Sequence, residues 1–264
     1  MIQVKADVSS NILLLPDPGA WLLRVRAPDL VHARAGQYVM VRCGEGMEMP
    51  LRRPLTVHRT SAEGEIQLLY AVVGRGTEWL AGRREGDALD IIGPLGNGFD
   101  AVPPSSRVLL VAGGMGVAPM VSLACQSLAE GAFVTLVIGA GTVAGIYPDN
   151  LLPAGVSTII TTEDGSAGRK GMATDFIEEL SRDADRVFAC GPLEMYRKMA
   201  GLSCLAGKPV RLLLEAVLGC GMGACLSCTI ETKSGPRKVC KDGPVFELSD
   251  ILWDKITAPP ARRR

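Results

Sequence analysis

Short apolar runs alternate with glycine and proline over about the first 100 residues. Six such runs cover residues 11–15, 21–27, 37–42, 51–59, 65–73 and 88–92. Runs of this length between turn-forming residues are typical of antiparallel β-strands. Six strands at this spacing favour a small barrel over a helical bundle. The N-terminal third is therefore predicted to form an antiparallel β-barrel.

The pattern changes near residue 105. Residues 107–112 form a continuous apolar run, as expected of a strand buried on both faces of a sheet. Further strands are predicted at residues 133–140, 156–162, 186–190 and 210–215, and helices at 121–130, 174–182 and 193–206. This alternation predicts a doubly wound parallel sheet. The fold class is thus multi-domain β plus α/β, with predicted domains at residues 1–102, 103–213 and 214–264.

Composition narrows the classes of partner. The 264 residues include 28 Lys and Arg and 28 Asp and Glu, so the formal net charge is zero. No basic stripe with interleaved aromatic residues indicates nucleic-acid binding. No apolar run reaches membrane-spanning length, and no N-terminal signal pattern is present, so no membrane association is expected. Eight cysteines without a signal sequence indicate a reducing, cytoplasmic compartment.

Half of the cysteines share a spacing of C-x4-C-x2-C-x11-C: Cys220, Cys225, Cys228 and Cys240. Plant-type ferredoxins use this spacing to hold a 2Fe–2S cluster with four thiolates. Three glycines let the loop approach an inorganic core closely, and they are Gly219, Gly221 and Gly223. Zinc is an alternative metal, although zinc sites usually contain two C-x2-C pairs and this stretch contains one. Disulfides are a third possibility, which the absence of other marks of secretion disfavours.

Two stretches of the barrel region carry phosphate-binding chemistry. Arg53 precedes Thr56 by three residues, so one strand offers a guanidinium fork for a phosphate and a hydroxyl for a ring edge. Residues 73–79 are expected to form a turn that opens a helix, with backbone N–H groups available to a pyrophosphate. Each stretch taken alone is equally consistent with a plain β-turn and solvated arginines.

A glycine loop, Gly113-Gly114-Met115-Gly116, follows the first buried strand of the sheet. Strand, glycine loop and helix form the context that holds a dinucleotide phosphate at the helix N-terminus. The loop departs from the usual G-x-G-x-x-G pattern. Residues 161–166 and 190–192 end two further strands, where ligands of such sheets bind. Ordinary loop chemistry explains each strand end separately but not all three together.

The order of barrel, sheet and cysteine cluster resembles the ferredoxin-reductase superfamily. More closely, it resembles the electron-transfer subunit of the NAD-dependent (class 1B) dihydroorotate dehydrogenase. The resemblance covers essentially the whole chain and rests on residues 53–56, 74–77, 93–96, 113–119 and 220–246. The most specific of these is the cysteine stretch from Cys220, which ends in Val-Cys-Lys-Asp-Gly-Pro-Val-Phe at residues 239–246.

The resemblance implies FAD in the barrel, NAD on the sheet and a 2Fe–2S cluster at the four cysteines. Arg53 would hold the FAD pyrophosphate and Thr56 would approach the flavin N5 edge. The other implied FAD contacts are Pro54, Leu55, Tyr70, Gly74, Gly76 and Thr77. The implied NAD contacts are Gly114, Gly116, Glu163 and Asp164. Cys190 would lie near the nicotinamide, so Thr56 and Cys190 are the implied catalytic residues.

The implied function is an electron relay. NADH delivers two electrons together as hydride and a 2Fe–2S cluster carries one, so a flavin stands between them. The implied partner is an FMN-containing catalytic subunit that oxidises dihydroorotate to orotate in pyrimidine biosynthesis, in a heterotetramer with two copies of each subunit. No side-chain general base is required, and the lone histidines His32 and His58 are not expected to be catalysts.

Two alternatives stay open at this point. Flavin/iron–sulfur subunits of sulfhydrogenases and of NADH-dependent ferredoxin:NADP oxidoreductases share most of these motifs. A non-catalytic, nucleotide-binding regulatory module with zinc at the cysteines belongs to a different class and would be colourless. Glu163 and Asp164 favour NADH over NADPH, because a carboxylate suits a ribose 2′-hydroxyl better than a 2′-phosphate.

Overall fold

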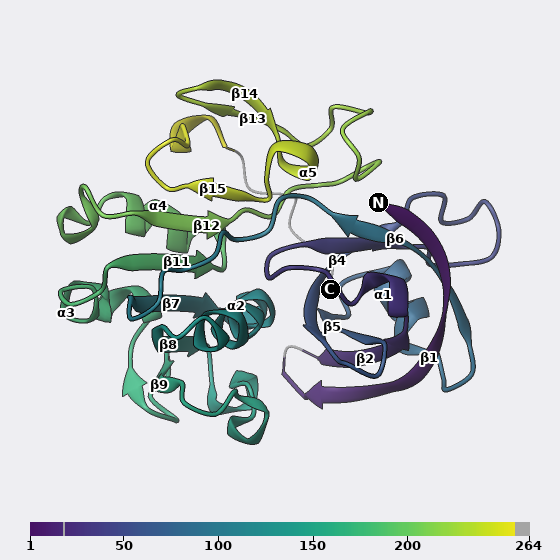
Figure 1. The fold of residues 1–264 in the computed structure, drawn as a ribbon, viewed down its shortest axis with the longest axis horizontal. Helices are drawn as coiled ribbons and strands as arrows, with labels where there is room; N and C mark the ends of the chain where they lie inside the picture. Colours follow the sequence, from purple (N-terminus) through teal and green to yellow (C-terminus); the bar gives the residue numbers. More distant parts are fainter. Residues whose placement is uncertain (18, 257–264) are drawn as a thin grey trace.

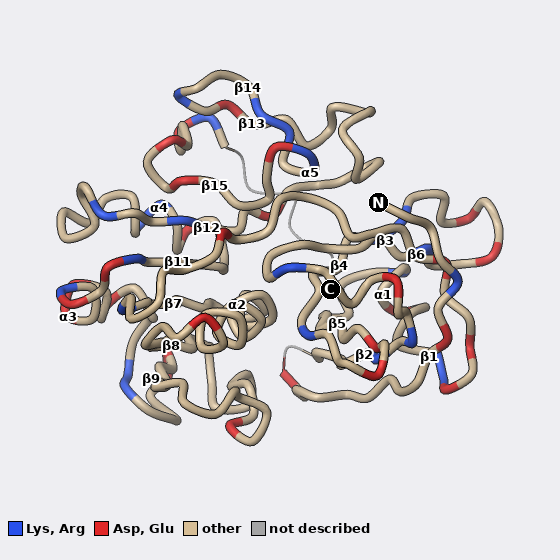
Figure 2. Tube along the Cα trace, in the orientation of Figure 1, with Lys and Arg blue, Asp and Glu red and all other residues tan. Residues whose placement is uncertain are grey.

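The computed structural model describes residues 1–17 and 19–256. A β-barrel and a mostly parallel sheet lie side by side, and a small cysteine-bearing hairpin module lies along one end of both (Figure 1). Acidic and basic residues are spread over all three parts (Figure 2). Within the described residues, no helix has the length and apolar character needed to cross a membrane. Residues 257–264 of the predicted third domain lie outside the described residues.

Six antiparallel strands close the barrel in the order β1-β2-β5-β4-β3-β6, which confirms the predicted barrel. The strands are β1 (Ile2–Leu15), β2 (Ala20–Arg26), β3 (Tyr38–Val41), β4 (Arg53–Thr60), β5 (Glu65–Ala71) and β6 (Ala88–Leu95). Every second residue of β6 is buried, as expected of a strand with one face in the core. The first half of β1 was not predicted, because its polar residues hid a strand that pairs with β6.

Seven strands form the sheet in the order β10-β9-β8-β7-β11-β12-β15, and all neighbours are parallel except β12 and β15. They are β7 (Arg107–Gly113), β8 (Phe133–Ala140), β9 (Ser157–Thr162), β10 (Arg169–Lys170), β11 (Arg186–Cys190), β12 (Val210–Leu213) and β15 (Val245–Glu247). Buried residues of β7 alternate between two apolar clusters, one on each face of the sheet. The doubly wound architecture is therefore as predicted.

Helices differ from the prediction mainly at their ends. Helix α1 (Arg75–Ala81) belongs to the barrel, and helix α2 (Val117–Ala129) starts four residues before its predicted start, with Pro119 in its first turn. The predicted helix 193–206 is helix α4 (Leu193–Ala200), which Gly201 ends, and a short 3-10 turn. The predicted helix 174–182 is a 3-10 turn followed by helix α3 (Ile177–Leu180).

The cysteine module returns to the sheet. After the hairpin of β13 (Thr229–Thr232) and β14 (Gly235–Lys238) and the short helix α5 (Val239–Asp242), strand β15 pairs antiparallel with β12. The segment predicted as a third domain therefore supplies an edge strand to the second.

One apolar cluster joins the barrel to the sheet. Leu22 and Leu69 of the barrel pack in the same buried cluster as Val117 and Val121 of α2. Phe99, which follows the barrel, meets Phe188 of β11 edge to face with ring centroids 5.4 Å apart. Burial of this shared surface holds the two parts together.

Candidate cofactor sites

The first half of β4 has an open edge. Residues 53–56 pair with β3 on one side, whereas pairing with β5 begins only at Val57. In the described register, the last residues of β5 pair with β2 alone. β4 and β5 are therefore not hydrogen-bonded to each other at the stretch predicted to bind FAD. The backbone N–H and C=O groups on that edge of β4 are available to a ligand.

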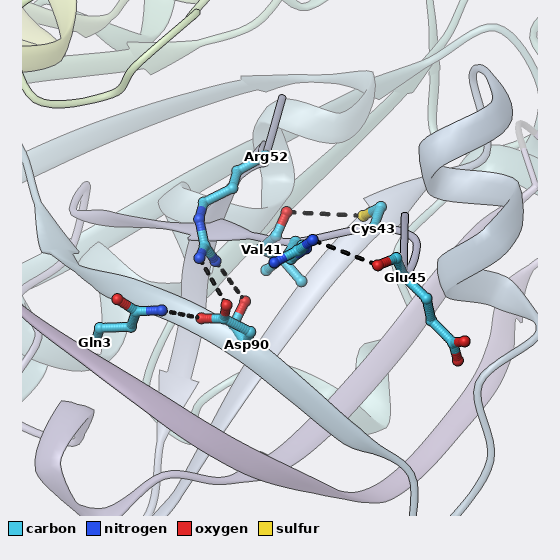
Figure 3. Close-up of polar contacts among 7 residues, drawn as sticks. Gln3, Val41, Cys43, Glu45, Arg52 and Asp90 are labelled. Atoms are coloured by element: carbon cyan, nitrogen blue, oxygen red, sulfur yellow. Dashed lines mark hydrogen bonds and ion pairs between the residues drawn. The ribbon is translucent and has the colours of Figure 1, made fainter. Parts of the chain in front are cut away.

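Two adjacent arginines at the start of β4 differ in their partners. Arg52 is held by Asp90: its Nη1 donates to the Asp90 carbonyl at 2.8 Å and its Nη2 pairs with the carboxylate at 2.7 Å (Figure 3). Arg53 has no ion pair among the described residues; its Nη1 donates to the Leu51 carbonyl at 2.5 Å. Arg53 therefore keeps most of its guanidinium donors for an anion.

Gly76 makes room for Arg53. A Cβ atom at Gly76 would stand 2.5 Å from the Arg53 Nε atom, so the guanidinium lies directly against the first turn of α1. Thr77 shapes this turn, because its Oγ1 accepts hydrogen bonds from the backbone N–H groups of Val73 and Gly74. The structure thus brings Arg53, Gly74, Gly76 and Thr77 together, with the Thr77 hydroxyl engaged by the turn itself.

The other residues predicted to contact FAD present different groups to the open edge. Pro54 is exposed, Thr56 is half-buried, and Leu55 faces the barrel core. The Tyr70 side chain also lies in the barrel core, where its hydroxyl donates to the Asn11 Oδ1 atom at 3.2 Å. Tyr70 therefore has only its backbone to offer at the open edge.

A cavity of about 670 Å³ lies at the carboxyl ends of the sheet strands. Its lining includes Gly113 at the end of β7, Ala140 at the end of β8, Glu163 after β9 and Pro192 after β11. This is where ligands of doubly wound sheets bind. Gly114 also lines the cavity, and its φ of 53° favours glycine.

Three residues predicted for NAD lie outside the cavity lining. Gly116 packs on β11, because a Cβ atom there would overlap the Cys190 carbonyl group. The Cys190 side chain is 2% exposed, and burial, followed by the nearby Glu215 carboxylate, raises the pKa of its thiol far above the usual range. The Asp164 carboxylate accepts hydrogen bonds from the Ser166 N–H and hydroxyl, which lower its pKa. Glu163 alone of the predicted acidic pair lines the cavity.

The four spaced cysteines lie in two neighbouring pairs. Cys220 and Cys225 interact at the exposed end, and Cys228 and Cys240 interact at the buried end. Backbone N–H groups of Met222, Ala224 and Cys225 point at the Cys220 Sγ atom from 3.3 to 3.4 Å, and the Cys240 N–H points at the Cys228 Sγ atom at 3.4 Å. Among the described residues, no group of three or more metal-ligating side chains is already assembled in metal-binding geometry.

Both pairs suit a positively charged metal centre. Hydrogen bonds from Ser227 lower the pKa of the Cys225 thiol to about 6, which favours the thiolate. Burial, followed by the neighbouring Cys228 thiol, raises the pKa of Cys240 to about 12. A bound cation deprotonates such a thiol, so the buried pair gains most from metal. The glycine backbone, the N–H groups at sulfur and four thiols fit a 2Fe–2S cluster.

Strand β3 holds both cysteine segments against the barrel. The Tyr38 hydroxyl lies 2.8 Å from the Gly221 carbonyl oxygen and 3.1 Å from that of Cys240. Met40 lies beneath Gly221, where a Cβ atom would stand 2.7 Å from its Cγ atom. The loop after β6 adds Asn97, whose side chain donates to the carbonyls of Lys241 and Asp242. Tyr38 was not predicted, because it is a lone tyrosine in an apolar strand.

Arg197 and Lys198 were also missed. Both line the cavity from α4, and each pairs with a carboxylate: Arg197 with Glu194 at 2.8 Å and Lys198 with Asp175 at 2.5 Å. They give the cavity two cationic groups, each balanced by its carboxylate partner. The available sequence signal was two basic residues in the helix that follows the strand end at residue 190.

Comparison with known proteins points to one family. Residues 215–252 match the family model described as the iron-sulfur cluster binding domain of dihydroorotate dehydrogenase B. The chain is 40% identical over 223 residues to the dihydroorotate dehydrogenase B (NAD+) electron transfer subunit of Bacillus caldolyticus, covering 82% of this chain and 86% of that one. It is 35% identical over 246 residues to the subunit of the same name from Desulforamulus reducens, covering 90% and 94%.

Solved structures share the architecture. An NADH-dependent reduced ferredoxin-NADP oxidoreductase matches with a TM-score of 0.85 and 30% identity, covering 94% of this chain and 90% of that one. A ferredoxin NADP+ reductase from Neisseria gonorrhoeae matches with a TM-score of 0.61 and 15% identity, covering 74% and 88%. The second likeness concerns the fold alone.

Proposed function

Because the chain belongs to the family of dihydroorotate dehydrogenase B (NAD+) electron transfer subunits, we propose that it passes electrons between NAD and a catalytic subunit that oxidises dihydroorotate to orotate. Its cofactors are FAD, a 2Fe–2S cluster and NAD. FAD exchanges hydride with the nicotinamide and single electrons with the cluster. The protein contributes the binding sites and their relative positions.

The observation that carries this proposal is the pairing of β3 with β4. Thr56 of β4 lies directly opposite Tyr38 of β3. Thr56 belongs to the open edge beside Arg53, whereas the Tyr38 hydroxyl contacts the Gly221 and Cys240 carbonyls. Two neighbouring strands therefore carry the proposed flavin site and the proposed cluster site, which is the arrangement that direct electron transfer between them requires.

We assign the binding roles as follows. Arg53, beside Gly76, binds the FAD pyrophosphate, while Thr56 and the backbone of the open edge of β4 bind the flavin. The cavity at the sheet strand ends binds NAD, with Gly114 at its floor and Glu163 at the ribose. The cluster ligands are Cys220, Cys225, Cys228 and Cys240.

The catalytic subunit is proposed to carry FMN and to dock over the exposed end of the cysteine loop. Apolar side chains flank that end: Val217 is 59% exposed, Met222 45% and Leu226 58%. The Cys225 thiol lies among them and is exposed. An exposed apolar group beside a redox centre suits a protein partner that must approach the centre closely. Two copies of each subunit are proposed.

Reconstitution with the catalytic subunit tests this function. The expected result is NAD reduction that requires dihydroorotate, both subunits and an intact cluster. A Cys225→Ser subunit tests the need for the cluster and should be inactive. Its matched control is Cys125→Ser, which alters a cysteine outside the proposed ligand set and should leave the rate unchanged. No NAD reduction by the complete, cofactor-loaded mixture would overturn the proposed partner.

One alternative is favoured by a specific observation. The NADH-dependent reduced ferredoxin-NADP oxidoreductase covers 94% of this chain at a TM-score of 0.85. A subunit of such an enzyme would use ferredoxin and a second nucleotide in place of dihydroorotate. Reduced ferredoxin as the required electron donor in the reconstituted system, with dihydroorotate inert, would establish that alternative.

A further inference from the structure

His58 is buried where the barrel meets the nucleotide sheet. It is 0% exposed, and among the described residues it is the only buried side chain of the Asp, Glu, Lys, Arg and His types. It belongs to β4, two residues beyond Thr56, at an irregularity in the pairing with β5 between Val57 and Arg59. Leu55 and Val57 face the barrel core, so His58 lies on the opposite face of β4, toward the sheet.

Both ring nitrogens of His58 contact the nucleotide-binding part. Nδ1 lies 2.8 Å from the Ala118 carbonyl oxygen, and Nε2 lies 2.9 Å from the Tyr147 hydroxyl. A carbonyl oxygen only accepts, so Nδ1 carries the proton and donates to Ala118. Burial lowers the pKa of His58 to about 4, so the imidazole is neutral near pH 7. Nε2 is then the acceptor, the Tyr147 hydroxyl donates to it, and both nitrogens are satisfied.

Both hydrogen-bond partners of His58 belong to segments that border the nucleotide cavity. Ala118 lies in the first turn of α2, two residues after Gly116 in the glycine loop. Tyr147, 2% exposed, follows the loop after β8, whose last residues line the cavity. The His58 and Tyr147 rings meet edge to face with centroids 5.6 Å apart and planes at 69°.

Few other directional contacts cross this interface. Arg59 Nη2 donates to the Leu151 carbonyl and the Ala35 N–H lies 3.4 Å from the Gln126 Oε1 atom, and both contacts are only partly buried. The remaining contacts are largely those of the shared apolar cluster, and apolar contact is non-directional. The two hydrogen bonds of His58 are directional and lie in a buried site, where their geometry is demanding. They set where the glycine loop stands relative to the strand that carries Thr56.

We propose that His58 and Tyr147 are a positioning pair that holds the nucleotide cavity in register with the flavin-binding edge of β4 for hydride transfer. Both side chains are buried, and neither lines the nucleotide cavity. The proposal rests on the proposed function for its kinetic consequence. It extends that function by naming residues that act through orientation, where a misplacement of about 1 Å can cost roughly 100-fold in rate.

Three variants separate the two hydrogen bonds. Tyr147→Phe keeps the ring and the His58–Ala118 bond but removes the donor to Nε2. His58→Asn keeps a donor near the Nδ1 position and removes the acceptor for Tyr147. The double variant contains both changes. His32→Asn is the matched control, because His32 is exposed on the barrel surface.

The first measurement is flavin reduction in a single turnover of the FAD-loaded protein with saturating NADH. Tyr147→Phe and His58→Asn should each slow it roughly tenfold or more while FAD content and the NADH dissociation constant stay unchanged. The double variant should be no slower than the slower single variant, because either change alone already disrupts the His58–Tyr147 pair. Unchanged rates in both single variants, or loss confined to NADH affinity, would overturn the proposal.

The second measurement does not depend on turnover. Hydrogen exchange of backbone amides at residues 114–122 in the FAD-loaded protein without NADH should be faster in Tyr147→Phe than in wild type and unchanged in His32→Asn. Unchanged exchange in Tyr147→Phe would contradict a positioning role. If wild-type flavin is not reduced by NADH at all, the proposed function fails, and the exchange result still decides whether the pair holds the interface.

Discussion

The barrel meets its two neighbours through different kinds of contact. Toward the nucleotide sheet it offers an apolar surface and few polar contacts, of which His58 with Tyr147 and the Ala118 carbonyl is the fully buried one. Toward the cysteines it binds backbone: Tyr38 and Asn97 contact carbonyl groups, and Met40 lies against a glycine. We call the contact of the barrel with α2 and Tyr147 the sheet joint, and its contact with the cysteine loop the cysteine joint. The sheet joint depends on the identity of particular side chains, whereas the cysteine joint depends on the path of the cysteine loop.

This difference matches what each joint must do. On the proposed function, a nucleotide would enter and leave the cavity, so the sheet joint has to keep an orientation without closing the site. A cluster would stay bound, so the cysteine joint can enclose its proposed ligands in a fixed loop. We therefore expect variants at the sheet joint to change rates and stability, and variants at the cysteine joint to change cluster content.

The largest expected effect is at a proposed cluster ligand. Cys225→Ser should remove most of the cluster iron, because a hydroxyl is a poor replacement for the thiolate whose pKa the loop lowers. FAD should be retained, because Arg53 and the open edge of β4 are untouched. Iron and flavin analysis of purified protein provides the measurement, with Cys125→Ser as the control. Full iron content in Cys225→Ser would refute the ligand assignment.

Acid pH tests the sheet joint. Burial, together with the nearby Arg59, lowers the pKa of His58 from 6.5 to about 4, although the Ala118 carbonyl opposes the shift. The unfolded chain takes up its proton near pH 6.5 and the folded chain only near pH 4. The free energy of unfolding is therefore unaffected by this group above pH 6.5. It falls as the pH drops toward 4, by about 3 kcal/mol for a shift of this size.

Urea unfolding of wild type and His58→Asn between pH 4 and 7 measures this loss. Burial raises the pKa of Tyr147, which faces His58, to about 12, so its hydroxyl does not ionise over this range. The variant should show a clearly shallower pH dependence, since carboxylates elsewhere contribute equally to both proteins. Identical slopes would mean that His58 is not held neutral at the interface.

Substitutions of the two adjacent arginines at the start of β4 test the proposed FAD site. Arg53→Ala should weaken FAD binding by about 2 kcal/mol, roughly 30-fold, because a phosphate loses charge-assisted hydrogen bonds. Arg52→Ala is the matched control and should leave FAD affinity unchanged, because Arg52 is engaged by Asp90. Titration of FAD into apoprotein gives both constants. Equal losses in the two variants would remove the special role of Arg53.

The smallest expected effect concerns the cysteine joint. Tyr38→Phe deprives the Gly221 and Cys240 carbonyls of a donor, at a cost of about 1 kcal/mol. Iron release to a chelator should become several-fold faster, with FAD content unchanged. Tyr147→Phe removes a hydroxyl at the other joint and should release iron at the wild-type rate. Equal acceleration in both variants would show that the joints are not independent.

The parts of the fold that sequence could predict depend on local signals. Glycine and proline mark the turns of the barrel, and the continuous apolar run at β7 marks a strand buried on both faces. Strand β15 was missed because three residues carry no periodicity, and its pairing with β12 is a tertiary fact. The first half of β1 was missed because its alternation is broken by polar residues.

The same distinction holds for the sites. The cysteine spacing and the glycine loop are local, and sequence could predict both. Tyr38 contacts carbonyls 183 and 202 residues away, and His58 contacts partners 60 and 89 residues away. Their neighbours in sequence give no sign of these partners. Sequence could therefore propose groups for cofactor binding, but it missed the groups that hold the parts of the fold together.

The most direct test of the relay is the visible absorption spectrum of the purified, cofactor-loaded protein, recorded before and after NADH is added without air. The expected result is a coloured protein whose flavin and iron–sulfur bands both lose intensity. The cluster band of Cys225→Ser should be absent while its flavin band still responds to NADH. A colourless protein, or flavin bands that bleach while an intact cluster band does not change, would contradict electron transfer from the nucleotide cavity to the cysteine loop.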